Sequence, residues 1–125
     1  MKKCILIVDD EPSIRLILER YFSMEYEVVV KENGLEAINW LHEGNLTDCI
    51  VADLEMPVMD GLEFITQLRA TLLYQDIPLV MLSGKDDSSF KIRCLKQGAD
   101  DYMVKPFNPE ELDIRIDKLL KRIKI

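Results

Sequence analysis

ILIVDDEPS, residues 5–13, joins four apolar residues directly to three acids, Asp9, Asp10 and Glu11. The apolar run is typical of a strand that is buried on both faces. Adjacent carboxylates at the end of such a strand are unfavourable, because two unit charges about 4 Å apart repel by about 4 kcal/mol at an effective dielectric of 20. We therefore expect these acids to bind a positive charge.

Short apolar runs alternate with amphipathic stretches five times along the chain. The expected strands are residues 4–8, 27–31, 48–53, 77–82 and 101–105. Five strand–helix units with short connections predict an α/β fold, in which one parallel sheet has helices on both faces. The whole chain, residues 1–125, is then one domain, and 48% hydrophobic residues suffice for its core.

Local signals predict where the helices lie. Gly44 and Gly98 are expected to end the second and fourth helices. Asn33 and Asn108 are expected N-caps, and NPEE (108–111) also has proline in the first turn and Glu111 at the capping-box position. Three stretches carry apolar residues at helical spacing: Ile14, Ile17, Leu18 and Tyr21; Ile38 and Leu41; and Leu62, Ile65, Leu68 and Leu72.

Composition excludes several classes of function. The net charge of −7 argues against direct contact between this segment and nucleic acid, whose phosphate backbone attracts basic surfaces. No apolar run approaches the roughly 20 residues of a membrane span. The apolar stretch after the initial MKKC is too short for a signal peptide, so we expect a cytoplasmic protein without membrane contact. The three cysteines lack a CxxC spacing, which favours reduced thiols over a disulfide or zinc site.

Acids and one lysine end three of the expected strands. Asp9 and Asp10 follow the first, Asp53 ends the third and Lys105 ends the fifth. Ligands of parallel sheets bind beyond the carboxyl ends of the strands, so we expect these side chains to meet. Three carboxylates, one lysine and one divalent cation have no net charge, and Mg²⁺ favours a few carboxylates and waters. The sequence therefore predicts a Mg²⁺ site at this edge of the sheet.

Five motifs stand at the ends of the expected elements: VDDE (8–11), DLEMPVMDG (53–61), LSG (82–84), GADDYMVKPF (98–107) and NPEEL (108–112). In this order they resemble the receiver domains of two-component response regulators, the CheY-like family, over the whole chain. The separations of Asp53 from Ser83 and of Ser83 from Lys105, 30 and 22 residues, are also typical of that family. The resemblance implies a flavodoxin-like, doubly wound (βα)5 fold with strand order 2-1-3-4-5.

The resemblance also implies a function and assigns residues to it. Asp53 is implied to be the nucleophile that accepts a phosphoryl group from a histidine kinase or phosphotransfer protein. Asp10, Asp53 and the backbone carbonyl of Glu55 are implied to ligate Mg²⁺, with Asp9 acting through water. Lys105 is implied to pair with Asp53 and then with a phosphoryl oxygen. Such a domain is a signalling switch that catalyses only its own phosphorylation and dephosphorylation.

Two further residues are implied to form the switch. Ser83 stands where the family has threonine or serine, and its hydroxyl is expected to hydrogen-bond the phosphoryl group. Tyr102 matches the aromatic residue whose ring turns inward behind that hydroxyl, although a packed aromatic without a switching role is the alternative. Pro106 matches the proline that follows the family lysine through a cis bond.

Two charged residues are expected to flank the approach to Asp53. Glu55 and Lys85 stand two positions after Asp53 and Ser83, and their opposite charges predict an exposed ion pair. Such a pair would restrict the access of water to a phosphorylated Asp53. The alternative is that Glu55 alone orients the attacking water and promotes hydrolysis.

The output surface is expected on the fourth helix, the fifth strand and the fifth helix. This part of the sequence resembles the OmpR/PhoB-type subgroup, which implies a homodimer on phosphorylation. Ile92 and Leu95 are the expected apolar centre, and Asp113 departs from the small apolar residue usual at that contact. Ordinary charged helix faces are the alternative. The candidates for reciprocal salt bridges are Lys91, Asp100, Asp101, Glu111, Arg115 and Arg122.

Other proteins of doubly wound architecture differ at the same positions. A flavin- or nucleotide-binding module would need a Gly- or Ser/Thr-rich phosphate loop after the first strand, and here that loop is acidic. A metal-dependent phosphatase with an aspartate nucleophile usually has DxD there, which DDE does not match. A degenerate receiver, acting only as a docking module, would lack Asp53, Lys105 or one acid of the pair.

Overall fold

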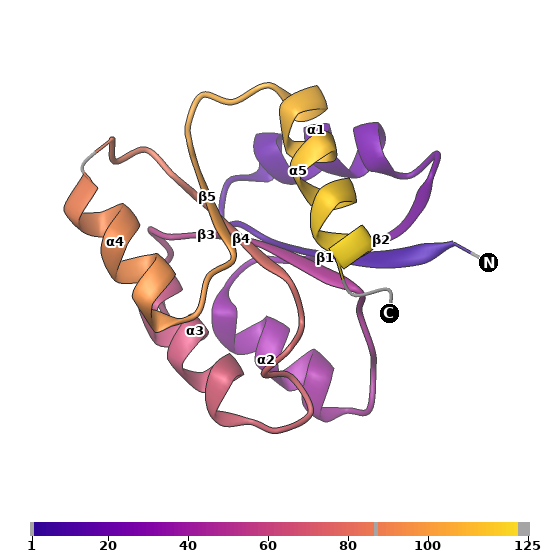
Figure 1. The fold of residues 1–125 in the computed structure, drawn as a ribbon. Coiled ribbons are helices and arrows are strands. Elements are labelled where there is room, and N and C mark those ends of the chain that lie inside the picture. The colour runs from indigo at the N-terminus through magenta and orange to yellow at the C-terminus, as the bar shows by residue number, and fades with distance from the viewer. Residues whose placement is uncertain (1, 87, 123–125) are drawn as a thin grey trace.

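The structure, a computed structural model, describes residues 2–86 and 88–122 (Figure 1). Within these ranges five strands alternate with five helices. The strands are β1 (Lys3–Val8), β2 (Tyr26–Lys31), β3 (Cys49–Asp53), β4 (Leu79–Ser83) and β5 (Asp101–Val104). The helices are α1 (Pro12–Phe22), α2 (Gly34–His42), α3 (Gly61–Ala70), α4 (Ser88–Gln97) and α5 (Pro109–Arg122).

The strands form one parallel sheet in the order β2-β1-β3-β4-β5. Helices α1 and α5 cover one face of the sheet, and α2, α3 and α4 cover the other (Figure 1). This arrangement confirms the doubly wound fold. The strand order reverses between β1 and β3, and the carboxyl ends of these strands therefore lie at the switch point where ligands of such sheets bind.

The core consists of two layers because successive strand residues point to opposite faces. Leu6 and Val8 of β1 pack in the layer beneath α2, α3 and α4, whereas Ile5 and Ile7 pack beneath α1 and α5. The three central strands are almost free of exposed side chains, which explains why their sequences are apolar without alternation. In a strand of this kind, a charged residue is expected only at the end of the strand, where the chain leaves the sheet.

Several local predictions agree with the backbone. Gly44 and Gly98 have positive φ values of 96° and 125° just after α2 and α4, as helix-ending glycines do. The Asn33 side chain accepts the N–H of residue 36 at 2.9 Å, and that of Asn108 accepts the N–H of residue 110 at 2.9 Å. The peptide bond between Lys105 and Pro106 is cis.

Two helix predictions are wrong in part. Ile17 and Tyr21 of α1 are exposed by 54% and 41%, because the helix packs through Leu18 and Phe22, one position further along. Leu72 lies outside α3, which ends at Ala70 because the next residue is extended, and its side chain is 82% exposed. The fourth strand also begins two residues later than expected and extends to residue 83.

The cysteines and the helices bear on the expectations from composition. Cys4, Cys49 and Cys94 are free thiols, and the last two are buried. Within residues 2–86 and 88–122, none of the helices has the length and apolar character needed to cross a membrane.

Candidate functional site

The strand register brings three acids together at the carboxyl edge of the sheet. Val8 of β1 pairs with Ala52 of β3, so the residues that follow them, Asp9 and Asp53, lie side by side at the carboxyl ends of adjacent strands. Asp10 comes next in the chain, and one carboxylate oxygen from each acid lies within 4.8 Å of the other two. The three acids predicted to meet therefore do so.

Lys105 reaches the same cluster from the end of β5. Its backbone N–H donates to the carbonyl of Ser83 at 2.7 Å and so continues the pairing of β4 with β5. Its Nζ lies 3.2 Å from Oδ2 of Asp9, 3.3 Å from Oδ1 of Asp53 and 3.6 Å from Oε1 of Glu11. Glu11 was missed as a partner of the lysine, although its place directly after the acid pair was a usable signal.

Burial changes the protonation of these groups. Burial, followed by the charge of Asp9, raises the pKa of Asp53 to about 7, although Lys105 opposes the shift. The pKa of Asp9 is also raised, again chiefly by burial. Burial alone would lower the pKa of the Lys105 ammonium, but the charges of Asp53 and Asp9 outweigh it and the pKa is raised. The lysine therefore stays charged and is shared by two acids.

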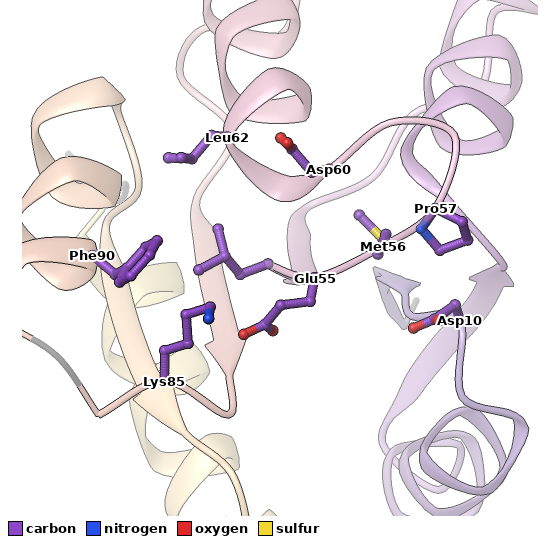
Figure 2. Close-up of a pocket in the computed structure, with 9 residues that line it drawn as sticks. Asp10, Glu55, Met56, Pro57, Asp60, Leu62, Lys85 and Phe90 are labelled. Carbon is purple, nitrogen blue, oxygen red and sulfur yellow. The ribbon is translucent and has the colours of Figure 1, made fainter.

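The donor set fits a hard divalent cation. Among the described residues, Oδ1 of Asp53 has no hydrogen-bond partner although it is buried and Lys105 lies nearby. Asp10 is exposed and lines a cavity of about 400 Å³ to which Glu55 also contributes (Figure 2). Mg²⁺ prefers carboxylate oxygens and waters, and a cation here would offset the mutual repulsion of the acids.

Backbone contacts hold the loop between Asp53 and α3. The N–H of Gly61 donates to the carbonyl of Leu54 at 2.8 Å, and a Cβ at Gly61 would lie 2.7 Å from the Leu54 Cα, so only glycine fits. The side chain of Asp60 caps α3 by accepting a backbone N–H at 2.9 Å. The loop that carries Glu55 therefore has a defined path beside the acid cluster.

Glu55 and Lys85 do not form the ion pair expected between them. Both side chains line the cavity (Figure 2), but the ion pairs of the described residues do not include this one. Oε1 of Glu55 accepts a hydrogen bond from Oγ of Ser83 at 2.9 Å. Nζ of Lys85 lies 5.0 Å from the centre of the Phe90 ring. The prediction is wrong because each charge has another partner, a buried hydroxyl or an aromatic face.

Ser83 and Tyr102 contact the same stretch of backbone. Ser83 is fully buried, and its Oγ accepts the backbone N–H of Lys85 at 2.9 Å. The hydroxyl of Tyr102, a residue only 4% exposed, donates to the backbone carbonyl of Lys85 at 2.8 Å. Burial raises the pKa of Tyr102 and a side-chain hydrogen bond with Ser83 opposes that shift, so the two residues are linked directly as well as through the Lys85 backbone.

Four residues of the expected dimer face already have partners within the chain. Asp100 pairs with Arg69 at 3.3 Å and accepts the first N–H of β4 at 2.8 Å. Asp101 Oδ1 lies 2.8 Å from a guanidinium nitrogen of Arg115, and Oε2 of Glu111 lies 3.7 Å from the other terminal nitrogen. A salt bridge to a second copy would have to replace these contacts.

The rest of that face is more open. Ile92 and Leu95 of α4 are 49% and 40% exposed, and Lys91 is also exposed. Asp113 faces away from them, because it lines a cavity with residues from the end of α1 and the turn into β2. The side chain of Arg122 lies outside the described part of the chain.

Comparison with known proteins agrees with this geometry. The sequence profile of the response regulator receiver domain matches residues 5–117. Transcriptional regulatory protein SrrA of Staphylococcus aureus (strain NCTC 8325 / PS 47) is 41% identical over 123 residues, which are 98% of this chain and 49% of SrrA. The chain spans about half the length of the curated relatives it matches.

Solved structures match the whole fold. The receiver domain of Francisella response regulator 1452 has a TM-score of 0.89 and 35% identity, covering 98% of this chain and 100% of that one. The receiver domain of sensor histidine kinase PA1611 from Pseudomonas aeruginosa PAO1 has a TM-score of 0.87 and 27% identity, covering 97% and 99%, and holds a magnesium ion in its active-site cleft. The chain therefore belongs to the response regulator receiver domains, the phosphorylation-activated switches of two-component signalling.

Proposed function

We propose that Asp53 accepts the phosphoryl group from a phosphorylated histidine of a histidine kinase or phosphotransfer protein. An oxygen of Asp53 bonds to phosphorus, the bond from phosphorus to the imidazole nitrogen breaks, and the imidazole takes a proton as it leaves. The observation that carries this proposal is the convergence of Asp9, Asp10, Asp53 and Lys105 at one sheet edge. Asp53 is the acid that ends a central strand there.

Asp10, Asp53 and the backbone carbonyl of Glu55 are the proposed direct ligands of Mg²⁺, and Asp9 acts through water. Asp9 suits an indirect role because both of its oxygens have partners. Oδ1 accepts a backbone N–H at 2.9 Å and Oδ2 lies 3.2 Å from Nζ of Lys105. Asp10 is exposed and faces the cavity. When bound, Mg²⁺ neutralises negative charge on the transferring phosphoryl group.

Lys105, Ser83 and Tyr102 respond to the new phosphoryl group. Before phosphorylation, Lys105 stabilises the charge of the Asp53 carboxylate. Afterwards its ammonium group contacts a phosphoryl oxygen and stabilises the charge there. The hydroxyl of Ser83 turns to donate to the phosphoryl group. Tyr102 follows because both residues bind the backbone of Lys85, at 2.9 Å and 2.8 Å.

The output of the switch is proposed to lie outside this chain. The relatives are transcriptional regulators about twice as long as the chain, which supports a gene-regulatory output domain in the whole protein. The receiver itself, with a net charge of −7, does not contact nucleic acid in this proposal. Phosphorylation favours a homodimer through the α4–β5–α5 face, where Ile92 and Leu95 are exposed.

The remaining features follow the family. Residues 1–125 act as one receiver domain, and the domain promotes the hydrolysis of its own aspartyl phosphate. It works in the cytoplasm, where the donor is a histidine kinase or a phosphotransfer protein.

Acetyl phosphate with Mg²⁺ tests the proposal without the cognate kinase. We expect one acid-stable but alkali-labile mass increase of a single phosphoryl group on the wild type and none on Asp53→Asn. Asp60→Asn is the matched control, because Asp60 lines the same cavity and asparagine also caps helices. Full phosphorylation of a folded Asp53→Asn protein would assign the nucleophile to another residue.

A further inference from the structure

The hydroxyl of Ser83 is held by a neighbouring carboxylate. Ser83 Oγ donates to Oε1 of Glu55 at 2.9 Å and accepts the backbone N–H of Lys85 at 2.9 Å. A serine hydroxyl has a single proton to donate. Because Ser83 is fully buried, bulk water does not offer it another acceptor. The Tyr102 hydroxyl also lies within reach of Ser83, but it is a neutral acceptor that donates its own proton to the Lys85 carbonyl, so the Glu55 carboxylate is the stronger acceptor for the one donor of Ser83.

This contact competes with the role of Ser83 in the proposed function. To donate to a phosphoryl oxygen on Asp53, the hydroxyl must first leave Glu55. Breaking this hydrogen bond is costly, because a charged acceptor holds a donor more strongly than a neutral one does. We propose that Glu55 is a positioning residue that holds the Ser83 hydroxyl in the unphosphorylated arrangement and thereby weakens binding of the phosphoryl group. The inference rests on the proposed function of Asp53 and Ser83.

The hydrogen bond between Glu55 and Ser83 connects the ends of β3 and β4, and a second hydrogen bond extends this connection to β5. Glu55 belongs to the loop after β3 and Ser83 ends β4, while the backbone carbonyl of Lys85 accepts the Tyr102 hydroxyl of β5 at 2.8 Å. The Lys85 side chain lies over Phe90 of α4, on the side of the cavity away from Asp10 (Figure 2). Release of Ser83 from Glu55 therefore removes a restraint on a loop that contacts both Tyr102 and α4.

Glu55 also carries a charge, which would repel a phosphoryl group whether or not the residue holds Ser83. Substitutions separate the two effects. Glu55→Ala removes both the charge and the acceptor, whereas Glu55→Gln removes the charge and keeps an acceptor oxygen. Asp60→Asn removes a charge from the same cavity at a residue whose carboxylate caps α3. Only an effect of the hydrogen bond depends on the presence of the Ser83 hydroxyl.

The affinity for beryllofluoride, a phosphoryl analogue, tests the inference by calorimetry in excess Mg²⁺ at pH 8. We expect Glu55→Ala to bind it roughly three- to tenfold more tightly than the wild type, and Glu55→Gln to gain less. In a Ser83→Ala background, the gain from Glu55→Ala should fall to no more than that of Asp60→Asn. Because Glu55 belongs to the proposed Mg²⁺ site, the Mg²⁺ affinity of each variant is measured first, and Mg²⁺ is kept saturating in every beryllofluoride titration.

The outcomes are distinct. An equal gain with and without Ser83→Ala would overturn the inference and assign the effect to charge alone, and no gain from Glu55→Ala would overturn it directly. A folded wild type that binds no beryllofluoride in Mg²⁺ would overturn the proposed function itself, and the role of Glu55 with it.

Discussion

Nζ of Lys105 lies 3.3 Å from Oδ1 of Asp53, an oxygen that has no hydrogen-bond partner in residues 2–86 and 88–122. The same ammonium lies 3.2 Å from Asp9, so one positive charge serves two buried acids. Lys105 therefore offsets only part of the penalty for ionising Asp53, whose pKa burial raises to about 7. This shortage of positive charge makes the metal-free protein sensitive to pH and to substitution of the acids.

Asp53 should make the metal-free protein less stable as the pH rises. Its pKa is raised from 3.8 to about 7, so the folded state retains a proton that the unfolded state releases. The resulting stabilisation is complete below about pH 4 and is lost as the pH rises through about 7. At pH 8, Asp53→Asn should raise the free energy of unfolding by about 1 kcal/mol or more, since one pKa unit corresponds to about 1.4 kcal/mol.

Urea denaturation in a chelator between pH 4 and pH 8 measures this difference. The free energy of unfolding of Asp53→Asn should exceed that of the wild type by an amount that increases with pH. Parallel profiles for the two proteins, or a less stable Asp53→Asn at pH 8, would contradict the account of the acid cluster.

Substitution of Asp10 should weaken Mg²⁺ binding more than substitution of Asp9. Asp10 is exposed at the cavity, whereas both oxygens of Asp9 have partners in the chain. We expect Asp10→Asn to lose more than about tenfold in Mg²⁺ affinity and Asp9→Asn to lose less. Mg²⁺ titration followed by NMR provides the measurement, with Asp60→Asn as an unaffected control. The reverse order for Asp9 and Asp10 would show that the direct ligand is misassigned.

Arg69 should contribute strongly to stability, although it takes no part in the cluster of Asp9, Asp10 and Asp53. It donates to three backbone carbonyls in the connections before β4 and β5, and it pairs with Asp100. Arg69→Met should lower the free energy of unfolding by about 2–4 kcal/mol, because it leaves these acceptors without partners. Lys96→Met, at an exposed position of α4, should change it by less than about 0.5 kcal/mol. Similar denaturation midpoints for the two variants would refute this role.

Beryllofluoride with Mg²⁺ should shift the chain from monomer towards a two-fold dimer. Arg115→Ala should weaken the dimer. The loss should be smaller than that of a full salt bridge, because Arg115 must give up its contact with Asp101 at 2.8 Å to reach a second copy. Arg20→Ala, on an exposed position of α1, serves as the control. Sedimentation velocity distinguishes the states. A monomer under both conditions would favour the view that the charges on this face serve only solvation and contacts within the chain.

The position of the acid cluster could be predicted because parallel strands in register end at one edge. Asp9, Asp53 and Lys105 needed only the strand pattern, and the observed pairs of residues place them together. The packing of α1 was less predictable, because periodicity identifies a helix but cannot decide between Tyr21 and its neighbour Phe22 as the buried residue. Leu72 was placed wrongly because the backbone becomes extended at Thr71 and ends α3 there, whatever side chain follows.

The partners of individual side chains were the least predictable part of the site. Charge favoured a pair between Glu55 and Lys85, but the structure has Glu55 on the Ser83 hydroxyl and Lys85 on the Phe90 ring. The partner of each side chain depends on its rotamer and on the burial of the Ser83 hydroxyl, and neither can be inferred from residue type and spacing. Glu11 is different, because its place directly after Asp9 and Asp10 was a usable signal for its contact with Lys105 at 3.6 Å.

The site of phosphorylation is tested most directly by chemical trapping. Borohydride reduces an aspartyl phosphate to homoserine, so the wild type is treated with acetyl phosphate and Mg²⁺, reduced, and digested for peptide mass spectrometry. We expect homoserine at position 53 and at no other aspartate position, with the signal absent when Mg²⁺ is chelated. Homoserine at Asp9 or Asp10, with an unmodified Asp53, would contradict this expectation.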